Sequence, residues 1–139
     1  MKQATAEIEI ASPGAGLHEV TDEVRRWVDG QGMTEGLLTL FCRHTSASLL
    51  IQEDAAPAAR RDLEAYFARI APEDPNAYEH DDEGPDDMPA HLKAALTGLS
   101  LSIPVLGGRP ALGTWQAVYL VEHRRAPHRR RLALHLIGD

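Results

Sequence analysis

The sequence predicts an α+β fold with a largely antiparallel sheet. The 139 residues fit one domain, 1–139, which is long enough to bury roughly two thirds of the surface that the unfolded chain exposes. Segments typical of strands outnumber segments with helical periodicity. They occur in the order strand, helix, two strands, helix, loop with a short helix, and three strands, which differs from a repeat of βαβ units.

One strand and one helix are predicted in the first 30 residues. Apolar and polar residues alternate over residues 4–10, which is typical of a strand with one face in solvent. Thr21 is a favourable N-cap residue, and apolar side chains spaced i, i+3 and i+4 after it predict a helix up to Val28. Gly30 is expected to end this helix.

Two strands and a longer helix follow. Residues 36–43 indicate a strand that is apolar on both faces, and residues 47–52 indicate a second strand. The tripeptide His-Thr-Ser separates them. Pro57 is suited to the start of a helix, and apolar side chains recur at helical spacing from there to Ile70. We expect this helix to pack on the sheet.

The second half of the chain is predicted to contain a loop, a short helix and three strands. Residues 71–88 are rich in Pro, Asp, Glu and Gly and predict a loop, and residues 89–97 predict a brief helix. The three strands are expected over residues 99–105, 117–122 and 130–137. Both faces of the middle strand are apolar, so we expect it to be covered on both sides, with another subunit as one candidate cover.

The composition excludes several classes of protein. Cys42 is the only cysteine, which rules out a disulfide within one chain and a zinc site made of several cysteines in one subunit. The N-terminal residues carry no apolar targeting segment and no run of 18 apolar residues occurs, so a cytoplasmic protein without a membrane partner is expected. The formal net charge of −7 argues against general nucleic-acid binding, because phosphates attract basic surfaces.

Charge is unevenly distributed along the chain. Residues 73–87 hold eight acids and no Lys or Arg. Five arginines crowd the C-terminal end, namely Arg124, Arg125, Arg129, Arg130 and Arg131. A solvated loop and a solvated strand end are the simple interpretations. A divalent-cation site in the first segment and an anion clamp in the second are the functional alternatives.

Three histidines lie close to carboxylates and short apolar segments. His44, His80 and His91 would match the three protein ligands of many catalytic zinc sites if the fold brought them together. Their spacings of 36 and 11 residues fit no self-contained zinc motif, and surface histidines would give the same pattern. Glu53 and Asp82 are candidate cation ligands, general bases or partners that fix a histidine tautomer, although both could also face solvent.

Hydroxyl, aromatic and amide side chains supply further candidates. Ser46 follows His44 closely, but a serine nucleophile is not expected because the GxSxG turn is missing. As a donor to a phosphate or sulfate oxygen Ser46 is more plausible, particularly beside Arg130. Trp115 and Gln116 could form a stacking surface with an amide, although a core tryptophan at a strand start is the simpler interpretation. We do not expect site roles for His18, His123, His128 and His135.

Four motifs, in order across about residues 16–138, resemble the YjbQ family, the secondary thiamine-phosphate synthases. They are HTSASLLIQED, YEHDDEGPDDMPAHLKAALTGLSL, IPV followed by a glycine turn, and LGTWQAVYLVEH with RRRL behind it. The resemblance implies an α+β fold with a seven-stranded, mostly antiparallel β-sandwich-like core, two main helices and one short helix. It also implies a homotrimer with sites near the subunit contacts.

The activity that the resemblance implies is the joining of an aminopyrimidine diphosphate to a thiazole phosphate, with release of diphosphate. In the family this activity looks secondary to another role. The implied assignments are His44, His80 and His91 for metal or diphosphate binding, Glu53 and Asp82 for cation ligation or orientation, Ser46 and Arg130 for oxyanion contacts, and Trp115 and Gln116 for the ring. A divalent metal, zinc or magnesium, is the candidate cofactor, and small phosphorylated metabolites are the expected ligands.

Two other functions would use the same residues. A metal-dependent phosphate-ester hydrolase would place water where the thiazole attacks. A non-catalytic trimer would bind an anion or a small metabolite, and its histidines and acids would then stabilise loops.

Overall fold

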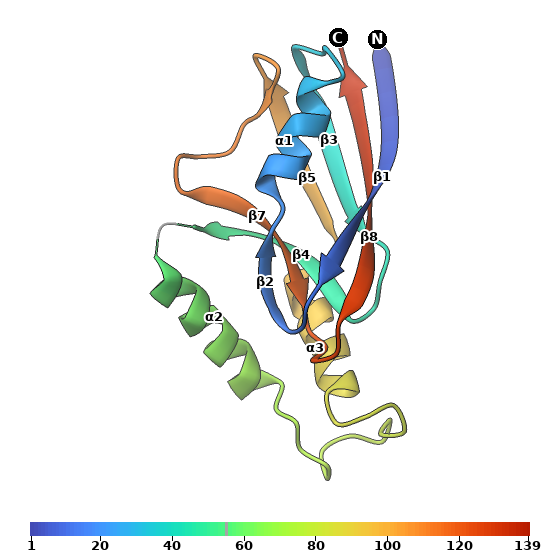
Figure 1. Cartoon of the computed structure of the whole chain (residues 1–139), viewed down its shortest axis with the longest axis vertical. Coiled ribbons are helices and arrows are strands. Elements are labelled where there is room, and N and C mark those ends of the chain that lie inside the picture. Colours follow the sequence, from blue (N-terminus) through green and yellow to red (C-terminus); the bar gives the residue numbers. More distant parts are fainter. Residues whose placement is uncertain (55) are drawn as a thin grey trace.

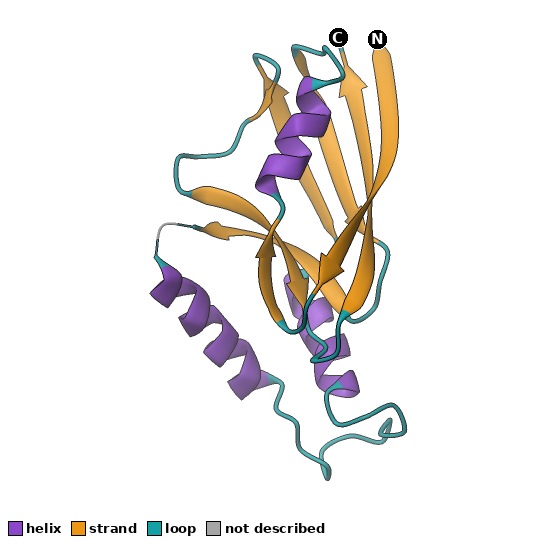
Figure 2. Ribbon diagram, in the orientation of Figure 1, coloured by secondary structure: helices purple, strands orange, loops and turns teal. Residues whose placement is uncertain are grey.

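The computed structural model describes residues 1–54 and 56–139 as two antiparallel sheets with three helices (Figure 1, Figure 2). The elements in chain order are β1 Lys2–Ser12, β2 Gly16–Glu19, α1 Thr21–Asp29, β3 Glu35–Cys42, β4 Ala47–Glu53, α2 Pro57–Ile70, α3 Asp87–Thr97, β5 Ser100–Leu106, β6 Arg109–Pro110, β7 Gln116–Glu122 and β8 His128–Gly138. Seven of these strands have four residues or more, and all the strand pairs of the described residues are antiparallel. The predicted α+β class is therefore confirmed.

The main core lies between the two sheets and helix α1. One sheet has the strand order β1-β8-β3-β5-β6, and the other has the order β2-β7-β4. Buried side chains from β3, β8, β4 and β7 meet in this core together with the apolar stripe of α1. The predicted stripe of α1 is borne out by Val24 and Val28, each 1% exposed. This core positions the ends of β3, β4 and β7, near which the candidate site residues lie.

Strand β3 has two apolar faces, as predicted, but the chain covers only one of them. Leu38 and Leu40 are fully buried in the main core. Leu37 and Phe41 point to the opposite face and remain 43% and 44% exposed. Because side chains alternate along a strand, this exposed face carries apolar groups that the described chain leaves in solvent.

Strand β7 is covered on both sides, as predicted, and the second cover belongs to the same chain. Val118 and Leu120 face the main core. Tyr119 and Val121 face the other way into a smaller core, against which Leu63 of α2 packs. The expectation that another subunit supplies this cover is thus not needed, because α2 already lies over that face.

Helix α2 packs on the sheet less closely than predicted. None of its residues is buried, and Tyr66 and Ile70 are 49% and 42% exposed. Figure 1 shows the helix alongside the three-stranded sheet and away from α1. Only part of the apolar stripe therefore faces the sheet, as Leu63 does. In the described ranges, none of the helices combines the length and apolarity that crossing a membrane requires.

Some local predictions were wrong for physical reasons that the sequence pattern does not report. Thr21 does not cap α1, because its hydroxyl accepts a hydrogen bond from Val118 N at 2.9 Å and Val20 occupies the N-cap position. The short strands β2 and β6 were not predicted, since their four and two residues carry too little periodicity. Helix α3 begins at Asp87, earlier than the predicted start at Pro89.

Candidate functional site

Four ionisable side chains converge where the acidic loop meets helix α3. His80 and Glu83 come from the loop, and Asp87 and His91 come from the helix. One ligand atom from each lies within 4.8 Å of the others. The Nε2 atom of His80 lies 2.9 Å from Glu83 Oε2 and 3.2 Å from Asp87 Oδ2. We call these four residues the His/acid cluster.

Local sequence explains how the cluster forms. Asp87 and His91 are four residues apart on α3, so they lie on the same side of the helix, with 3.1 Å between Oδ2 and Nε2. The chain returns over the helix at Gly84, whose φ of 99° is accessible to glycine at little cost. The turn places His80 and Glu83 above the first turn of α3.

Arg124 holds the acidic loop against the rest of the molecule. Its Nη1 donates to Asp87 Oδ1 at 2.7 Å, and its Nη2 donates to the Glu83 carbonyl at 3.0 Å. Its Nε donates to Asp86 Oδ2 at 3.2 Å. Burial disfavours the charged form of Asp86, but hydrogen bonds from Arg125 N and Arg124 outweigh it and lower the pKa of this carboxyl. The loop is therefore anchored by charge at its C-terminal end, beside the cluster.

The tautomer of His91 is determined by a backbone contact. Its Nδ1 lies 2.8 Å from the carbonyl oxygen of Thr45, which can only accept, so Nδ1 carries the hydrogen. In the neutral ring Nε2 then presents a lone pair to Asp87 Oδ2. Two lone pairs at 3.1 Å repel each other unless a proton or a metal ion lies between them. Histidines that bind metals commonly donate their other N–H to a carbonyl in this way.

Carboxylates favour a positive charge at His80. The hydrogen bond with Glu83 raises the pKa of the His80 imidazole, and the charges of Asp82, Glu83 and Asp87 add to this effect. Asp82 was predicted to ligate or orient a cation, and its Oδ1 lies 3.5 Å from His80 Nδ1 on the solvent side. The carboxylates around His80 therefore favour a cation at this position, either a proton on the ring or a metal ion.

Two hollows flank the cluster. One of about 240 Å³ lies beside His80 and is lined by Tyr78 and Met88 among others. The other, of about 510 Å³, lies beside His91 and is walled mainly by small and apolar residues of α3 and of the turn between α3 and β5, including Ala95 and Leu99. A ligand bound at the cluster would therefore have room on both sides.

His44 is not part of the His/acid cluster within the described chain. Its Nε2 accepts a hydrogen bond from Arg131 N at 2.7 Å. Burial, with the charge of Arg130 as the next cause, lowers the pKa of this imidazole. Of the three predicted imidazoles, the fold thus brings His80 and His91 together, with ring centroids 6.2 Å apart, and leaves His44 outside. The neighbouring Thr45 carbonyl is what links this segment to His91.

Arg130 was predicted to contact an oxyanion, but in this chain it is buried against Glu122. The two side chains are 4% and 1% exposed, and Arg130 Nε donates to Glu122 Oε1 at 2.8 Å. Its Nη2 also donates to Ser46 Oγ at 2.9 Å, so two predicted oxyanion ligands bind each other. In this chain the buried guanidinium of Arg130 has Glu122 as its counter-charge, so an oxyanion would have to compete with that carboxylate. The oxyanion role of Arg130 and Ser46 stays a prediction.

The other predicted ligands lie at the far end of the three-stranded sheet. Glu53 pairs with Gln116 at one end of the β4–β7 ladder, and Ala47 pairs with Glu122 at the other end. Six residues of strand separate the two ends by about 20 Å. Trp115 is 64% exposed rather than part of the core, and Gln116 Oε1 accepts a hydrogen bond from Gly113 N at 2.8 Å. Within one chain, these residues do not reach the cluster.

The sequence reasoning missed several residues of the site. Asp87 and Glu83 were seen only as parts of an acidic loop, although the four-residue spacing of Asp87 and His91 was a usable signal. Arg124 was grouped with the other arginines. His123 was set aside, yet it is 6% exposed and its Nε2 lies 2.9 Å from Ser48 Oγ. Burial lowers the pKa of this imidazole to about 4.

Comparison with known proteins identifies relatives of this chain in sequence and in fold. A family model described as "UPF0047 protein YjbQ-like" matches residues 6–139. The chain is 48% identical over 130 residues to the UPF0047 protein sll1880 of Synechocystis, covering 94% of this chain and 88% of that protein. It is 44% identical to the UPF0047 protein YjbQ of Escherichia coli O157:H7, covering 94% of each. A conserved hypothetical protein of Thermus thermophilus superimposes with a TM-score of 0.84 at 34% identity, covering 95% of this chain and 99% of that one.

Proposed function

This chain belongs to the YjbQ-like UPF0047 family, and from that membership together with its His/acid cluster we propose that it is a metal-dependent enzyme acting on small phosphorylated metabolites. We further propose a transferase reaction of the thiamine-phosphate synthase type. The observation that carries the proposal is the geometry of His91, whose Nε2 lies 3.1 Å from Asp87 Oδ2 while its Nδ1 lies 2.8 Å from the Thr45 carbonyl oxygen.

The donor set fits a transition metal better than magnesium. His80 and His91 offer nitrogen atoms, whereas magnesium prefers an almost complete shell of oxygen ligands and water. Glu83 and Asp87 add one oxygen each, and Asp87 is held from behind by Arg124. Of the two expected metals, we therefore favour zinc, bound by His80, Glu83, Asp87 and His91. When bound, such an ion would stabilise the negative charge of a leaving diphosphate.

The proposed transfer makes clear demands on the protein. The thiazole nitrogen attacks the methylene carbon of the aminopyrimidine, the bond from that carbon to the diphosphate oxygen breaks, and diphosphate leaves with the electron pair. Glu83 and Asp87 would hold the cation together with the imidazole nitrogens of His80 and His91. The hollow lined by Ala95 and Leu99 would shelter the apolar face of a ring from water.

In a homotrimer, site residues that lie far from the His/acid cluster within one chain could lie close to the cluster of a neighbouring copy. Trp115, Gln116 and Glu53 lie about 20 Å from the cluster end of the sheet, so we propose that a neighbouring copy supplies them. The apolar outer face of β3, with Leu37 and Phe41 more than two-fifths exposed, supports the proposal that copies associate.

Metal content provides the first test. His91→Ala and Asp87→Asn each remove one donor, so after dialysis against limiting zinc both variants should retain at least tenfold less metal than the unaltered chain. His18→Gln is the matched control, because His18 binds the Gly14 carbonyl away from the cluster and should leave metal content unchanged. Equal zinc in all four proteins would overturn the metal proposal.

Turnover is tested separately, with an aminopyrimidine diphosphate and a thiazole phosphate as substrates. Thiamine phosphate formed by the zinc-loaded chain, and lost on chelation, would support the transferase. Phosphate or diphosphate released without the thiazole would instead favour the hydrolase. That second candidate rests on the exposure of the cluster, where the side chains of His80 and Glu83 are 49% and 60% exposed and water can enter. Ligand binding without turnover would favour a non-catalytic module.

A further inference from the structure

A third cavity lies on the other side of helix α3 from the His/acid cluster. Its volume is about 130 Å³, and its walls include Leu17, Glu64, Phe67, Lys93, Val121 and His123. His91 and Lys93 are two positions apart on α3, so their side chains leave the helix at about 200° to each other. The cavity is therefore separate from the cluster, although the same helix serves both.

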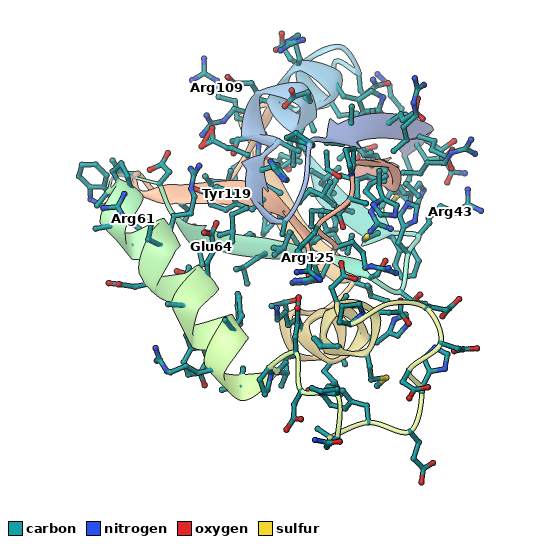
Figure 3. All side chains as sticks on the ribbon, turned by 60° about the horizontal axis from the view of Figure 1, so that its bottom comes forward. Arg43, Arg61, Glu64, Arg109, Tyr119 and Arg125 are labelled. Atoms are coloured by element: carbon teal, nitrogen blue, oxygen red, sulfur yellow. The ribbon has the colours of Figure 1, made fainter. Side chains whose placement is uncertain are left out.

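Two opposite charges line this cavity without neutralising each other. Lys93 is half-buried, and in the described part of the chain no carboxylate lies within 4.0 Å of its ammonium group. Glu64 points from α2 toward the sheet (Figure 3), where its Oε1 accepts a long hydrogen bond of 3.4 Å from Leu17 N. No ion pair of Glu64 with a basic group occurs among the described residues either. The carboxylates of Glu73 and Asp86 also act on Lys93 through their charge, but they form their ion pairs with Arg125 and Arg124. Lys93 and Glu64 can therefore both contact a ligand.

A buried imidazole supplies a neutral polar group in the same wall. His123 is 6% exposed and uses Nε2 for its contact with Ser48 Oγ, so Nδ1 is the nitrogen left for a ligand. Burial keeps the ring uncharged near neutral pH. The edge-to-face packing of His123 on Phe67, with centroids 6.5 Å apart, fixes the orientation of the ring.

The remaining wall is mostly apolar. Among the described residues its one other charged residue is Glu122, whose carboxylate already accepts hydrogen bonds from Ser12 and Arg130. Leu17 and Val121 are buried, and Phe67 is half-buried above them. A cavity of about 150 Å³ is large enough to hold a benzene molecule, so this cavity has room for a small organic molecule with a short apolar group.

We propose that this cavity binds a small zwitterion of the α-amino acid class, with its carboxylate on Lys93 and its ammonium on Glu64. The short side chain would lie against Phe67 and Val121, and His123 would hydrogen-bond to the ligand. The site does not depend on the metal centre, so it stands even if the proposed reaction does not.

Calorimetric titration of the full chain with alanine and valine tests the proposal, with acetate and ethylamine as half-ligands. At least one amino acid should bind tenfold more tightly than either half-ligand. Lys93→Met and Glu64→Gln should each weaken that binding at least tenfold. Lys2→Met and Asp62→Asn are the matched controls, and neither should change the affinity. Chelation by EDTA should also leave it unchanged.

A second measurement uses the fact that Lys2 and Lys93 are the only lysines. Bound amino acid should slow acylation of Lys93 and leave that of Lys2 unaffected, as read by mass spectrometry. Acetate that binds as tightly as alanine, no binding of any amino acid at millimolar concentration, or unprotected Lys93 would each overturn the proposal. Glu64 is exposed on α2 and glutamine has its shape, so failure of that variant to fold is not an expected complication.

Discussion

Replacing Arg130 by methionine should destabilise the protein strongly, because it leaves the buried carboxylate of Glu122 without its counter-charge. Glu122 accepts hydrogen bonds from Ser12 Oγ at 2.5 Å, from Arg130 Nε at 2.8 Å and from Arg124 N at 3.2 Å. Burial alone would raise the pKa of this carboxyl, but these hydrogen bonds, led by those of Arg130, lower it. In Arg130→Met the strongest of them are gone while the burial remains.

Removing one partner of a buried ion pair typically costs about 3–5 kcal/mol, against a total stability of about 5–15 kcal/mol for a domain. For a chain of this length we expect the midpoint of thermal unfolding to fall by about 10–20 °C. Adding Glu122→Leu to Arg130→Met should recover much of the loss, because two apolar side chains replace the pair. Arg129→Met is the matched control, since that side chain is 80% exposed and should change stability by no more than about 0.5 kcal/mol.

The effect of Arg130→Met should depend on pH. In the unaltered chain the folded-state pKa of Glu122 lies below the unfolded value of about 4.3, so its contribution is present above that pH and is lost as the pH falls through the folded pKa. In Arg130→Met, burial without the counter-charge raises the folded-state pKa of Glu122, so protonation of this carboxyl removes the cost of burying its charge. The difference in stability between the variant and the unaltered chain should therefore shrink as the pH is lowered toward 5. Urea unfolding of the unaltered chain and of the variant at pH 7.5 and pH 5 measures the stability loss and its dependence on pH. A loss below about 1 kcal/mol at pH 7.5, or a double variant less stable than the single one, would refute this reasoning.

Three further outcomes are expected. Burial lowers the folded-state pKa of His123 to about 4, so as the pH falls the unfolded state takes up a proton on this ring before the folded state does. The free energy of unfolding should therefore fall by about 3 kcal/mol between pH 6.5 and pH 4. Urea unfolding should show a smaller decline in His123→Gln. Leu38→Ala should cost about 2–5 kcal/mol in chemical unfolding, whereas Leu96→Ala, at a side chain of α3 that is 64% exposed, should cost less than about 1 kcal/mol, and equal losses would contradict the burial of Leu38 in the main core. In metal-free protein, NMR titration should show that Glu83→Gln lowers the pKa of His80, since the hydrogen bond with Glu83 is the main cause of its elevation; an unchanged value would exclude that contact in solution.

The pairing of the C-terminal arginines changes how the charge of this chain is understood. Arg124 binds Asp86 and Asp87 of the acidic loop, and Arg125 lies 3.3 Å from Glu73. Two of the five C-terminal arginines therefore pair with the acidic segment, whereas Arg129, Arg130 and Arg131 pair with Glu9, Glu122 and Glu7. The pairing of Arg124 and Arg125 with the acidic segment explains why a chain of net charge −7 can hold an acidic loop close to its own sheet.

Local patterns were sufficient for most of the fold. The alternation over residues 4–10 predicted β1, and the apolar faces of β7 predicted that it is covered on both sides. These patterns work because a helix or a strand repeats over a few residues, so neighbouring side chains report which face is buried. They failed where a distant group intervened, as at Thr21, whose hydroxyl binds a backbone N–H of β7 rather than its own helix.

The site could be predicted only in part, because its geometry depends on contacts between distant residues. The sequence singled out His80 and His91 by their chemistry, and the fold does bring them together. It could not exclude His44 or reveal the role of the Thr45 carbonyl, which meets His91 across 46 positions of the chain. Nor could it show that Arg130 forms an ion pair with the buried carboxylate of Glu122. The spacing of residues along a chain does not show which strand ends become neighbours in the fold. Those neighbours decide whether a charged side chain such as Arg130 forms a structural ion pair or remains available to bind a ligand.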